Sequence, residues 1–390
     1  MQAFVLFGGQ NQRMNELYVG LMSGTSMDGV DGVLVSFGEQ STPLSLTVLA
    51  HSHQPFAAAL AAELLALNAP GANELHRAAL AGNALAQAYA DGLHALLQAT
   101  GIDATQVQSI GAHGQTVRHR PGEFDGTGYT LQLLNAALLA ETTGIDVVAD
   151  LRSRDVAAGG QGAPLVPAFH RAFFGVASKA GAVLNIGGIS NLTALRADGT
   201  TTGFDCGPGN ALMDHWCQRH TGQPFDDGGA WAASGQVHAA LLQQLFSDPY
   251  FAALPPKSTG RDHFNPAWLD AQLRRVVNAH ALPTEAVQAT LTELTATVCA
   301  AAVRTHAADS DELLVCGGGA FNSHLMARMA ALLPGVQVAS TGERGLPPTQ
   351  VEAAAFAWLA RAFVRRECGS LPAVTGAAGA RVLGSLSPGR

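Results

Sequence analysis

The stretch GLMSGTSMDGVDGVLVSF, residues 20–37, places a polar, glycine-rich loop between two apolar runs. Residues 17–22 and 30–37 have the composition of strands, so we predict a β-hairpin. A plain hairpin turn needs one Asp-Gly pair, but residues 24–31 add two hydroxyl side chains and a second aspartate. The ordinary hairpin turn remains the alternative to a binding loop.

Such a loop is suited to phosphate, because small residues let backbone amides approach phosphate oxygens and hydroxyl groups add donors. A carboxylate can also hold Mg²⁺ through water, and Asp28 is the predicted ligand. The loop lacks the lysine of a Walker A sequence. The predicted nucleotide-binding residues here are Gly24, Thr25, Ser26, Met27, Asp28, Gly29, Val30 and Asp31.

Two further glycine loops lie in the second half of the chain. NIGGISN, residues 185–191, has the alternative of a Gly-Gly hairpin. GGGAFN, residues 317–322, follows a predicted strand and opens a helix, whose N-terminal amides suit an anion. Three such loops indicate a nucleotide held between two domains. From these two loops we predict contacts from Gly187, Gly188, Gly317, Gly318, Gly319 and Asn322.

Asp205 in GFDCGPGN is the candidate catalytic base. It ends an apolar strand just before a Gly-Pro turn and a helix, a place where side chains face clefts. Its carboxylate could accept a proton from a nucleophile within hydrogen-bond reach. The alternative is that Asp205 caps the following helix.

Further polar residues are candidates for the substrate pocket. GAHGQTVRHRP, residues 111–121, follows a buried strand, and an arginine there could bind a carboxylate with two hydrogen bonds. Each of these residues could equally lie in a surface loop, and the glutamate in the last long helix could simply face solvent. The candidates are His113, Gln115, Arg118, Asn191 and Glu352.

Composition limits the class of protein. A chain of 390 residues is long for one core, so two domains are expected. The formal net charge of −8, without a basic block, disfavours nucleic acid as a partner. The five cysteines include no C-x-x-C pair, which favours a reducing cytosol over a disulfide framework. No apolar run approaches the ~20 residues that span a bilayer, so we expect no membrane partner.

Seven motifs together resemble the anhydro-N-acetylmuramic acid kinase family, in order from about residue 18 to 365. They are GLMSGTSMDGVD, GAHGQTVRHRP, AAGGQGAPLVP, NIGGISNLT, GFDCGPGNALMD, KSTGRDHFN and VCGGGAFN. The resemblance implies an α/β, two-domain actin-like ATPase (ribonuclease H-like) fold with a central interdomain cleft. With it we expect an N-terminal extension over 1–17, domain I over 18–153 plus about 366–390, and domain II over 154–365.

The resemblance also implies the chemistry. With ATP and Mg²⁺, the enzyme would open 1,6-anhydro-N-acetylmuramic acid with water and phosphorylate O6, giving N-acetylmuramic acid 6-phosphate and ADP. Asp205 matches the family's catalytic aspartate, and the three loops match its two phosphate loops and its adenosine loop. The implied setting is peptidoglycan recycling in the cytoplasm, by a homodimer acting on a small sugar. Cys206 and Ser153 depart from the usual family residues.

Two other functions fit the same patterns less well. One is a kinase for another sugar or a small acid, within the same superfamily. The other is an actin- or Hsp70-like ATP-driven interaction protein, for which the tail after residue 368 is too short to supply a peptide-binding domain. A dinucleotide dehydrogenase fails because the glycine spacing is wrong and no acidic residue follows to bind a ribose.

Overall fold

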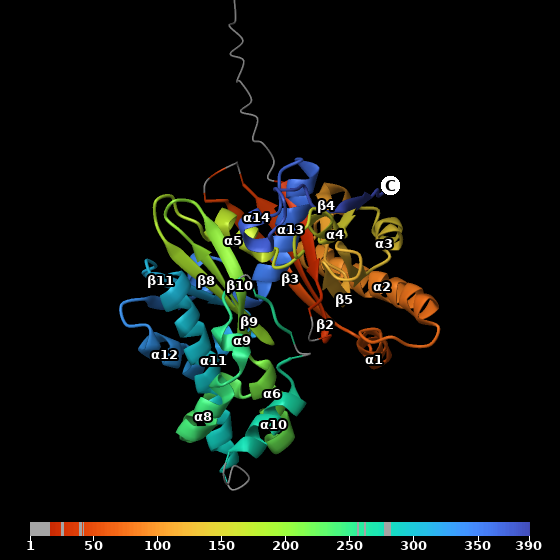
Figure 1. Cartoon of the computed structure of the whole chain (residues 1–390). Helices are drawn as coiled ribbons and strands as arrows, with labels where there is room; N and C mark the ends of the chain where they lie inside the picture. Colours follow the sequence, from red (N-terminus) through yellow and green to blue (C-terminus); the bar gives the residue numbers. More distant parts are fainter. Residues whose placement is uncertain are drawn as a thin grey trace, which may run out of the picture.

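The computed structural model describes residues 16–24, 27–38, 41, 43–255, 257–260, 263–276 and 282–390. Two β-sheets of the same topology, one in each half of the chain, form two lobes with helices on both sides (Figure 1). The predicted α/β fold with two similarly built halves is confirmed.

The first sheet has the strand order β13-β7-β4-β1-β2-β3. Strands β1, β2 and β3 form an antiparallel meander, β4 and β7 extend it in parallel, and β13 closes it antiparallel to β7. The strands are β1 (Glu16–Met22), β2 (Gly29–Phe37), β3 (Leu46–Pro55), β4 (Val107–Ala112), β7 (Val147–Ala149) and β13 (Ser385–Ser387).

The second sheet repeats this pattern in the order β10-β9-β8-β11-β12. Its first three strands are antiparallel, and β11 and β12 continue from β8 in parallel. The strands are β8 (Gly181–Ile186), β9 (Ile189–Leu195), β10 (Thr201–Pro208), β11 (Glu312–Cys316) and β12 (Gln337–Ser340). In both sheets the ends of parallel strands therefore meet at one edge, where loops can share a site.

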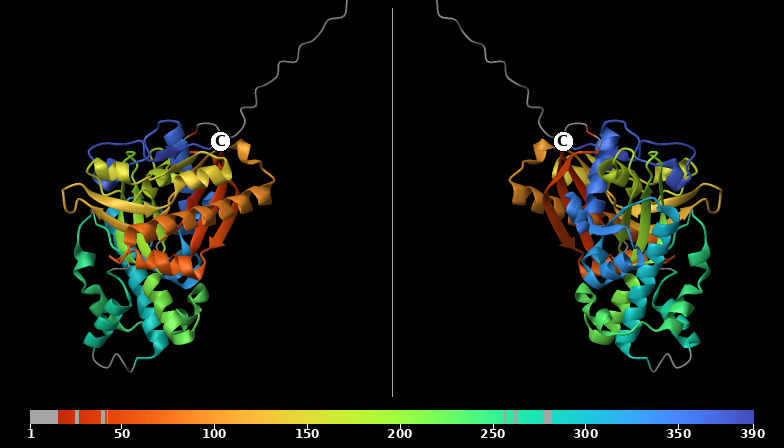
Figure 2. Two further views of the ribbon diagram at one scale, coloured as in Figure 1. Left: turned by 90° about the vertical axis from the view of Figure 1, so that its right-hand side faces the viewer. Right: turned by 90° about the vertical axis from the view of Figure 1, so that its left-hand side faces the viewer.

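Three apolar clusters give the order of the layers. Helix α2 (Glu74–Thr100) packs on the outer face of the first sheet, and α11 (Thr284–His306) packs on the outer face of the second. Between the sheets lie α5 (Val166–Phe174) and α13 (Val351–Val364), in a cluster that includes residues of both sheets. Figures 1 and 2 show α2 and α11 on the outer sides of their lobes. The two lobes thus share one apolar layer.

Helix α13 can lie close to the first sheet because two neighbouring strands have glycine where it crosses. Gly20 of β1 and Gly111 of β4 are paired in register. A Cβ at Gly20 would overlap the Ala353 carbonyl of α13, and one at Gly111 would overlap the Phe356 carbonyl. Only glycine permits a backbone approach this close.

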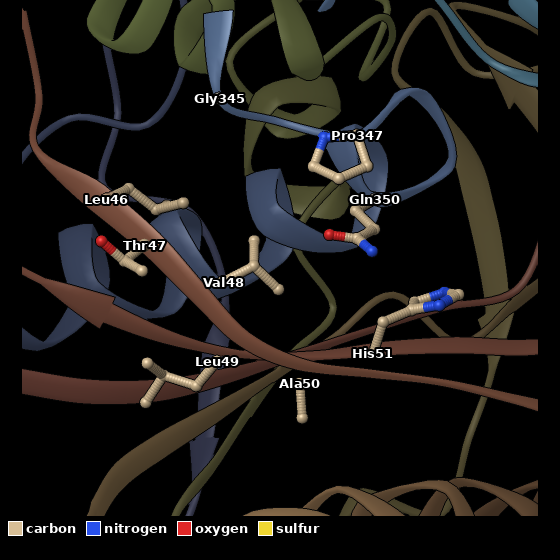
Figure 3. Close-up of a pocket in the computed structure, with 9 residues that line it drawn as sticks. All are labelled: Leu46, Thr47, Val48, Leu49, Ala50, His51, Gly345, Pro347 and Gln350. Atoms are coloured by element: carbon tan, nitrogen blue, oxygen red, sulfur yellow. The ribbon is translucent and has the colours of Figure 1, made fainter. Parts of the chain in front are cut away.

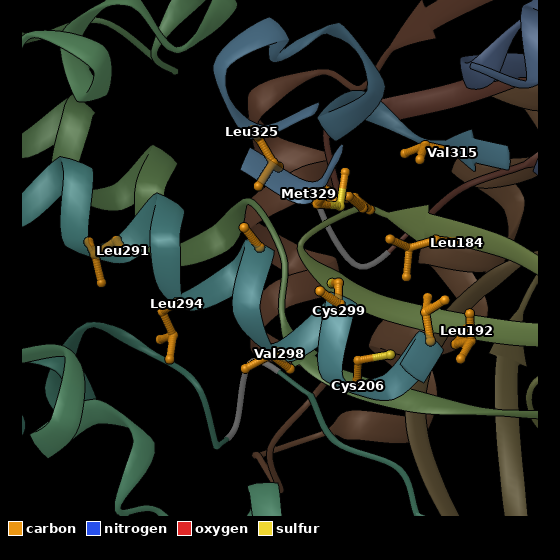
Figure 4. Packing of buried hydrophobic residues seen from close by; sticks show 14 of the residues in the cluster. Leu184, Leu192, Cys206, Leu291, Leu294, Val298, Cys299, Val315, Leu325 and Met329 are labelled. Carbon is orange, nitrogen blue, oxygen red and sulfur yellow. The ribbon is translucent and has the colours of Figure 1, made fainter. Parts of the chain in front are cut away.

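The core of the second lobe is built around α11, whose side chains meet those of β8, β9, β10 and α12 (Figure 4). Burying each leucine there contributes roughly 1.5–3 kcal/mol. Among the described residues, α11 is the one helix long and apolar enough to cross a membrane, but 89% of its most apolar window is buried inside the protein. Its apolar character is accounted for by this packing.

The other elements attach to these layers. The hairpin of β5 (Gln115–Pro121) and β6 (Gly128–Leu133) forms a separate two-stranded sheet. The remaining α-helices are α1 (Ala58–Ala66), α3 (Ala136–Thr143), α4 (Ser153–Ala157), α6 (Ala211–Thr221), α7 (Ala230–Ser234), α8 (Ala239–Phe246), α9 (Pro249–Ala252), α10 (Pro266–Arg275), α12 (Ser323–Leu332) and α14 (Pro372–Thr375).

Three details differ from the sequence analysis. Residues 16 and 17 belong to β1, whereas the rest of the expected extension, 1–15, lies outside the described residues. Helix α13, placed in domain II from the sequence, packs against β1, β4 and β2 of the first sheet. The domain boundaries expected from the sequence stay predictions. Strand β3 was not predicted at all, although its burial alternates along its length.

Candidate active site

The first glycine loop joins β1 to β2, as the sequence predicts. Ser23 is buried, the Met27 amide donates to the Gly24 carbonyl at 3.3 Å, and Met27 adopts a left-handed φ of 56°. The Asp28 side chain lies at the exposed end of the loop. Thr25 and Ser26, two of the predicted phosphate-binding residues, lie outside the described residues.

His113 and Gln115 hold the start of this loop. His113 Nδ1 lies 3.2 Å from the Ser23 carbonyl oxygen, and Gln115 Nε2 donates to the Gly24 carbonyl at 3.0 Å. Both side chains are buried. One nitrogen of each side chain thus contacts the loop backbone, and a contact of either residue with the substrate, expected from the sequence, stays a prediction.

Asp31, predicted as part of the loop, lies in β2 beside two histidines of β3. Its Oδ1 is 2.9 Å from His53 Nδ1 and 3.6 Å from His51 Nε2. Burial raises the pKa of Asp31, but hydrogen bonds from His51 and His53 outweigh that effect and lower the pKa overall. Asp31 is therefore a stable anion near neutral pH.

The second and third loops meet within the second lobe. Gly187 and Gly188 form the turn between β8 and β9, and their carbonyls accept from the amides of residues 209–211 at the start of α6. Gly317, with φ at 77°, has no room for a side chain beside Asn185 Oδ1, and Gly319 has none beside Ile186. The second and third glycine loops therefore lie side by side.

Asn322 has a structural task in the third loop. Its Oδ1 accepts from the Leu325 amide at 2.9 Å and so caps helix α12. A side chain in this role satisfies one of the free amides of the first turn. The sequence analysis predicted that Asn322 binds the nucleotide, whereas its oxygen is used by the helix.

Asp205 stands in a polar row across three neighbouring strands. It pairs in register with Asn191 of β9, which pairs with Asn185 of β8. Paired residues project from the same face of a sheet. The neighbouring residues Phe204, Leu192 and Leu184 belong to the apolar cluster under α11, so the polar row points the other way, toward the layer between the lobes.

The environment of Asp205 suits a general base. Its Oδ2 accepts from the Thr259 amide at 3.0 Å, the one hydrogen bond that its carboxylate makes within the described part of the chain. Burial raises the pKa of Asp205 to about 6, against a smaller lowering by the Thr259 amide. The alternative of a helix cap is wrong, because the N-cap of α6 is Asn210, five residues later.

The backbone of Asp205 is held by α9 and the segment that follows it. The Tyr250 hydroxyl donates to the Asp205 carbonyl at 2.6 Å, and the Asp205 amide donates to the Lys257 carbonyl at 3.2 Å. Lys257 in turn lies 4.6 Å from the centre of the Tyr250 ring. The sequence analysis missed Tyr250, since nothing in the local sequence marks its contact with a residue 45 positions away.

Glu352, in the first turn of α13, continues the polar site toward the first lobe. Burial raises the pKa of Glu352, Arg152 lowers it, and the charge of Asp31 raises it further. Its charge also acts on Cys316, which pairs in register with Asn185. Glu352 is thus placed between the polar row of the second lobe and the loop supports of the first.

Arg118 does not have a free guanidinium for a substrate. Its Nη2 lies 2.6 Å from Glu74 Oε1 at the start of α2. The prediction that Arg118 binds a substrate carboxylate therefore competes with an existing ion pair.

Two pockets lie outside this cluster of loops. One, of about 540 Å³, is between β3 and residues 345–350, with His51 and Gln350 on its wall (Figure 3). The other, of about 370 Å³, adjoins β10, α14 and His306. Asp205 and the three loops line neither of them.

A metal site made by the protein alone is absent from the described residues, which contain no group of three or more His, Cys, Asp or Glu able to hold an ion. Mg²⁺ in phosphoryl-transfer sites needs only one or two carboxylates, because phosphate and water supply the other oxygens. One carboxylate at the first loop, that of Asp28, fits this requirement.

Comparison with known proteins covers the part of the chain that contains this site. A family model described as anhydro-N-acetylmuramic acid kinase matches residues 16–389. A protein of that name from Variovorax paradoxus is 64% identical, covering 96% of this chain and 99% of its own length. Another from Albidiferax ferrireducens is 59% identical, covering 96% of this chain and 100% of its own length.

Solved structures are much more distant. An activator of 2-hydroxyisocaproyl-CoA dehydratase from Clostridium difficile has 11% identity and a TM-score of 0.47, covering 90% of this chain and 96% of its own. A ROK hexokinase from Thermus thermophilus has 13% identity and a TM-score of 0.37, covering 88% and 99%. These likenesses carry no argument about function. The match over nearly the whole length places the chain in the anhydro-N-acetylmuramic acid kinase family, among the phosphotransferases.

Proposed function

We propose that the protein is an ATP-dependent kinase that opens 1,6-anhydro-N-acetylmuramic acid with water and phosphorylates the released O6. The products are N-acetylmuramic acid 6-phosphate and ADP. Kinase activity is supported by the family match and by close relatives with that name. The hydrolytic opening rests on the site, and its main support is the environment of Asp205.

Asp205 is the proposed base. A carboxylate with a pKa near 6 is ionised at neutral pH, yet it binds a proton more strongly than an exposed aspartate. Its proton would come from the water that attacks the anomeric carbon. The bond from that carbon to the bridging oxygen then breaks, and the released O6 attacks the γ-phosphorus. Holding both reacting oxygens in place accounts for most of the rate of such a transfer.

The three loops would bind the phosphates. Amides of the first loop and the turn at Gly187 and Gly188 would face them from the two lobes, with residues 317–319 on the nucleotide side. Asp28 would hold Mg²⁺ through water, and the ion would supply charge neutralisation on the phosphates. We retain Gly24, Gly29 and Val30 as contacts of the first loop and assign Asp31 to its ion pair with His53.

The sugar would lie between Asp205 and Glu352. Asn191 adjoins Asp205 in the polar row and offers an amide to sugar hydroxyls. Glu352 reaches the same space from the start of α13. His113 and Gln115 each contact the loop backbone, and Arg118 is paired with Glu74. A cytoplasmic homodimer serving peptidoglycan recycling stays a prediction.

The experiment measures ADP release with and without 1,6-anhydro-N-acetylmuramic acid, with Mg²⁺ present. The proposal requires ADP release that depends on the sugar and a sugar 6-phosphate seen by mass spectrometry. Run in water labelled with oxygen-18 and sampled early, the reaction should place the label on C1 and none on phosphate. Product incubated without enzyme controls for exchange at C1. Label in the phosphate, or equal ADP release without sugar, would contradict the proposal.

A further inference from the structure

We propose that Arg152 is a positioning residue for the first glycine loop: it locks the ring of His113 in one tautomer, and that ring holds the Ser23 carbonyl. The inference rests on the proposed function only in taking this loop as the ATP phosphate site.

Several side chains hold the first residues of the loop in place. The Ser23 hydroxyl lies 2.9 Å from the Tyr89 hydroxyl and donates to the Gly114 carbonyl at 3.1 Å. The Ser23 carbonyl faces His113 Nδ1, and the next carbonyl, of Gly24, accepts from Gln115. Ser23 and Gly24 begin the loop, so these contacts fix where its backbone leaves β1.

The hydrogen bond from His113 to the Ser23 carbonyl forms in only one tautomer of the ring. A carbonyl only accepts hydrogen bonds, so the ring must carry its proton on Nδ1. The other nitrogen, Nε2, lies 3.0 Å from Arg152 Nε and 2.9 Å from Arg152 Nη2. A guanidinium only donates, so Nε2 must be the unprotonated nitrogen. Arg152 is therefore compatible with one neutral form of the ring.

A doubly protonated ring is excluded by the same surroundings. His113 is 4% exposed, and its Nε2 faces a cation. Burial, followed by the charge of Arg152, lowers the pKa of His113 to about 3. The ring is neutral over the range in which the enzyme works, and only the choice between the two neutral tautomers is left to Arg152.

Arg152 is itself firmly placed. Its Nη1 donates to the Gly162 carbonyl at 2.8 Å, and the Gly162 amide donates to Asp155 Oδ2 at 2.8 Å. Burial lowers the pKa of Arg152 to about 10, while the charges of Glu352 and Asp155 act to raise it. Arg152 thus contacts His113, which holds the first loop, and its charge also interacts with that of Glu352 at the start of α13.

The test reads the tautomer directly. In protein labelled with nitrogen-15 histidine, the His113 signals are assigned by their loss in His113→Asn, and their shifts report which nitrogen carries the proton. We expect Nδ1–H in the wild type and a mixture in Arg152→Met. A wild-type ring protonated on Nε2 or on both nitrogens would overturn the inference, whether or not any variant folds.

The consequence is measured by calorimetry with a non-hydrolysable ATP analogue and Mg²⁺. Arg152→Met should weaken binding roughly tenfold, the effect of losing about one buried hydrogen bond. The KM for the sugar should stay within about twofold. Asn at position 113 can donate to the Ser23 carbonyl through Nδ2 without help from an arginine. The double variant His113→Asn with Arg152→Met should therefore recover most of the affinity.

The control is Arg171→Met, which removes an arginine of α5 that also bonds backbone carbonyls, but in the second lobe. It should leave binding of the analogue unchanged. Unchanged affinity in Arg152→Met, or a double variant as weak as Arg152→Met, would overturn the inference. Wild-type protein unable to bind the analogue would instead contradict the proposed function, and the tautomer would still decide the inference.

Discussion

Each lobe has an aspartate on its antiparallel strands, Asp31 on the middle strand β2 and Asp205 on the outer strand β10, and the two have opposite properties. In the first sheet, Asp31 of β2 pairs in register with His53 of β3. In the second sheet, Asp205 of β10 pairs with Asn191 of β9. Histidine partners lower the pKa of Asp31 against the effect of burial, whereas burial with one amide partner raises that of Asp205 to about 6. One topology thus yields a stable anion and a base, depending only on the neighbours.

The largest effect should come from removing the base. Asp205→Asn keeps the shape of the side chain and the Thr259 contact but cannot accept a proton, so we expect kcat to fall about 10³-fold. ATP binding should remain measurable by calorimetry. Asp31→Asn is the matched variant in the other lobe and should lose far less. Near-normal kcat in Asp205→Asn would show that the base is another residue.

Two strand glycines, one in each sheet, differ in the room left for a side chain. Gly111→Ala puts a methyl group into the Phe356 carbonyl and should lower the free energy of unfolding by about 3 kcal/mol. Gly181→Ala, in β8 of the second sheet, meets no atom within 4 Å and should be close to neutral. Chemical denaturation of both variants measures the difference. Equal stability would mean that α13 does not lie against β4 as described.

The pH dependence of turnover sharpens the comparison. As pH falls through about 6, Asp205 gains a proton and can no longer act as the base, so kcat should decline on the acid side with an apparent pKa near 6. Asp31 stays ionised through this range and adds no step. Steady-state rates from acid to neutral pH measure the profile. An acid limb near the ordinary aspartate pKa of 3.8 would place Asp205 in a solvated environment.

The smallest effect is the change in the free energy of unfolding when either aspartate is replaced by asparagine. It should have opposite signs in the two lobes. Because Asp205 has a higher pKa when folded, its ionisation favours unfolding, and stability is lost as pH rises from about 4 to 6. Asp205→Asn should then raise the free energy of unfolding by about 1 kcal/mol at neutral pH. Asp31 has a lowered pKa, so its charge favours folding above the ordinary pKa. Because the Asp31 side chain is 40% exposed, solvent screens its pairing, and Asp31→Asn should cost only about 0.5 kcal/mol there.

The difference for Asp205 should shrink near pH 4, where its wild-type carboxyl is protonated, whereas the difference for Asp31 should shrink only below the ordinary aspartate pKa of 3.8. Thermal melting at neutral pH, at about pH 4 and at a lower pH measures both. Changes of the same sign in both variants would contradict the assigned pKa shifts.

Elements whose conformation depends on neighbouring residues were predicted correctly from the sequence. The hairpin around the first loop, the glycine turn at Gly187 and Gly188, and the strand ending near Asp205 were all predicted from composition and spacing. Partners distant in sequence were not predictable. His113 contacts a residue 90 positions away and Arg118 pairs with Glu74 across the first lobe, and nothing in the local sequence indicates either contact. Asn322 looked like a ligand because helix capping and ligand binding use the same residue types.

The sequence by itself determined the list of chemical groups: three glycine loops, one strand-terminal aspartate and an apolar pattern for two α/β halves, since backbone conformation and amphipathic period are local properties. Tertiary structure alone decided what those groups can do. It placed histidines beside Asp31 and the Thr259 amide beside Asp205, and it turned His113 and Arg152 toward the first loop. The physical reason is that the pKa of a buried group depends on burial and on nearby charges, which come from distant parts of the chain.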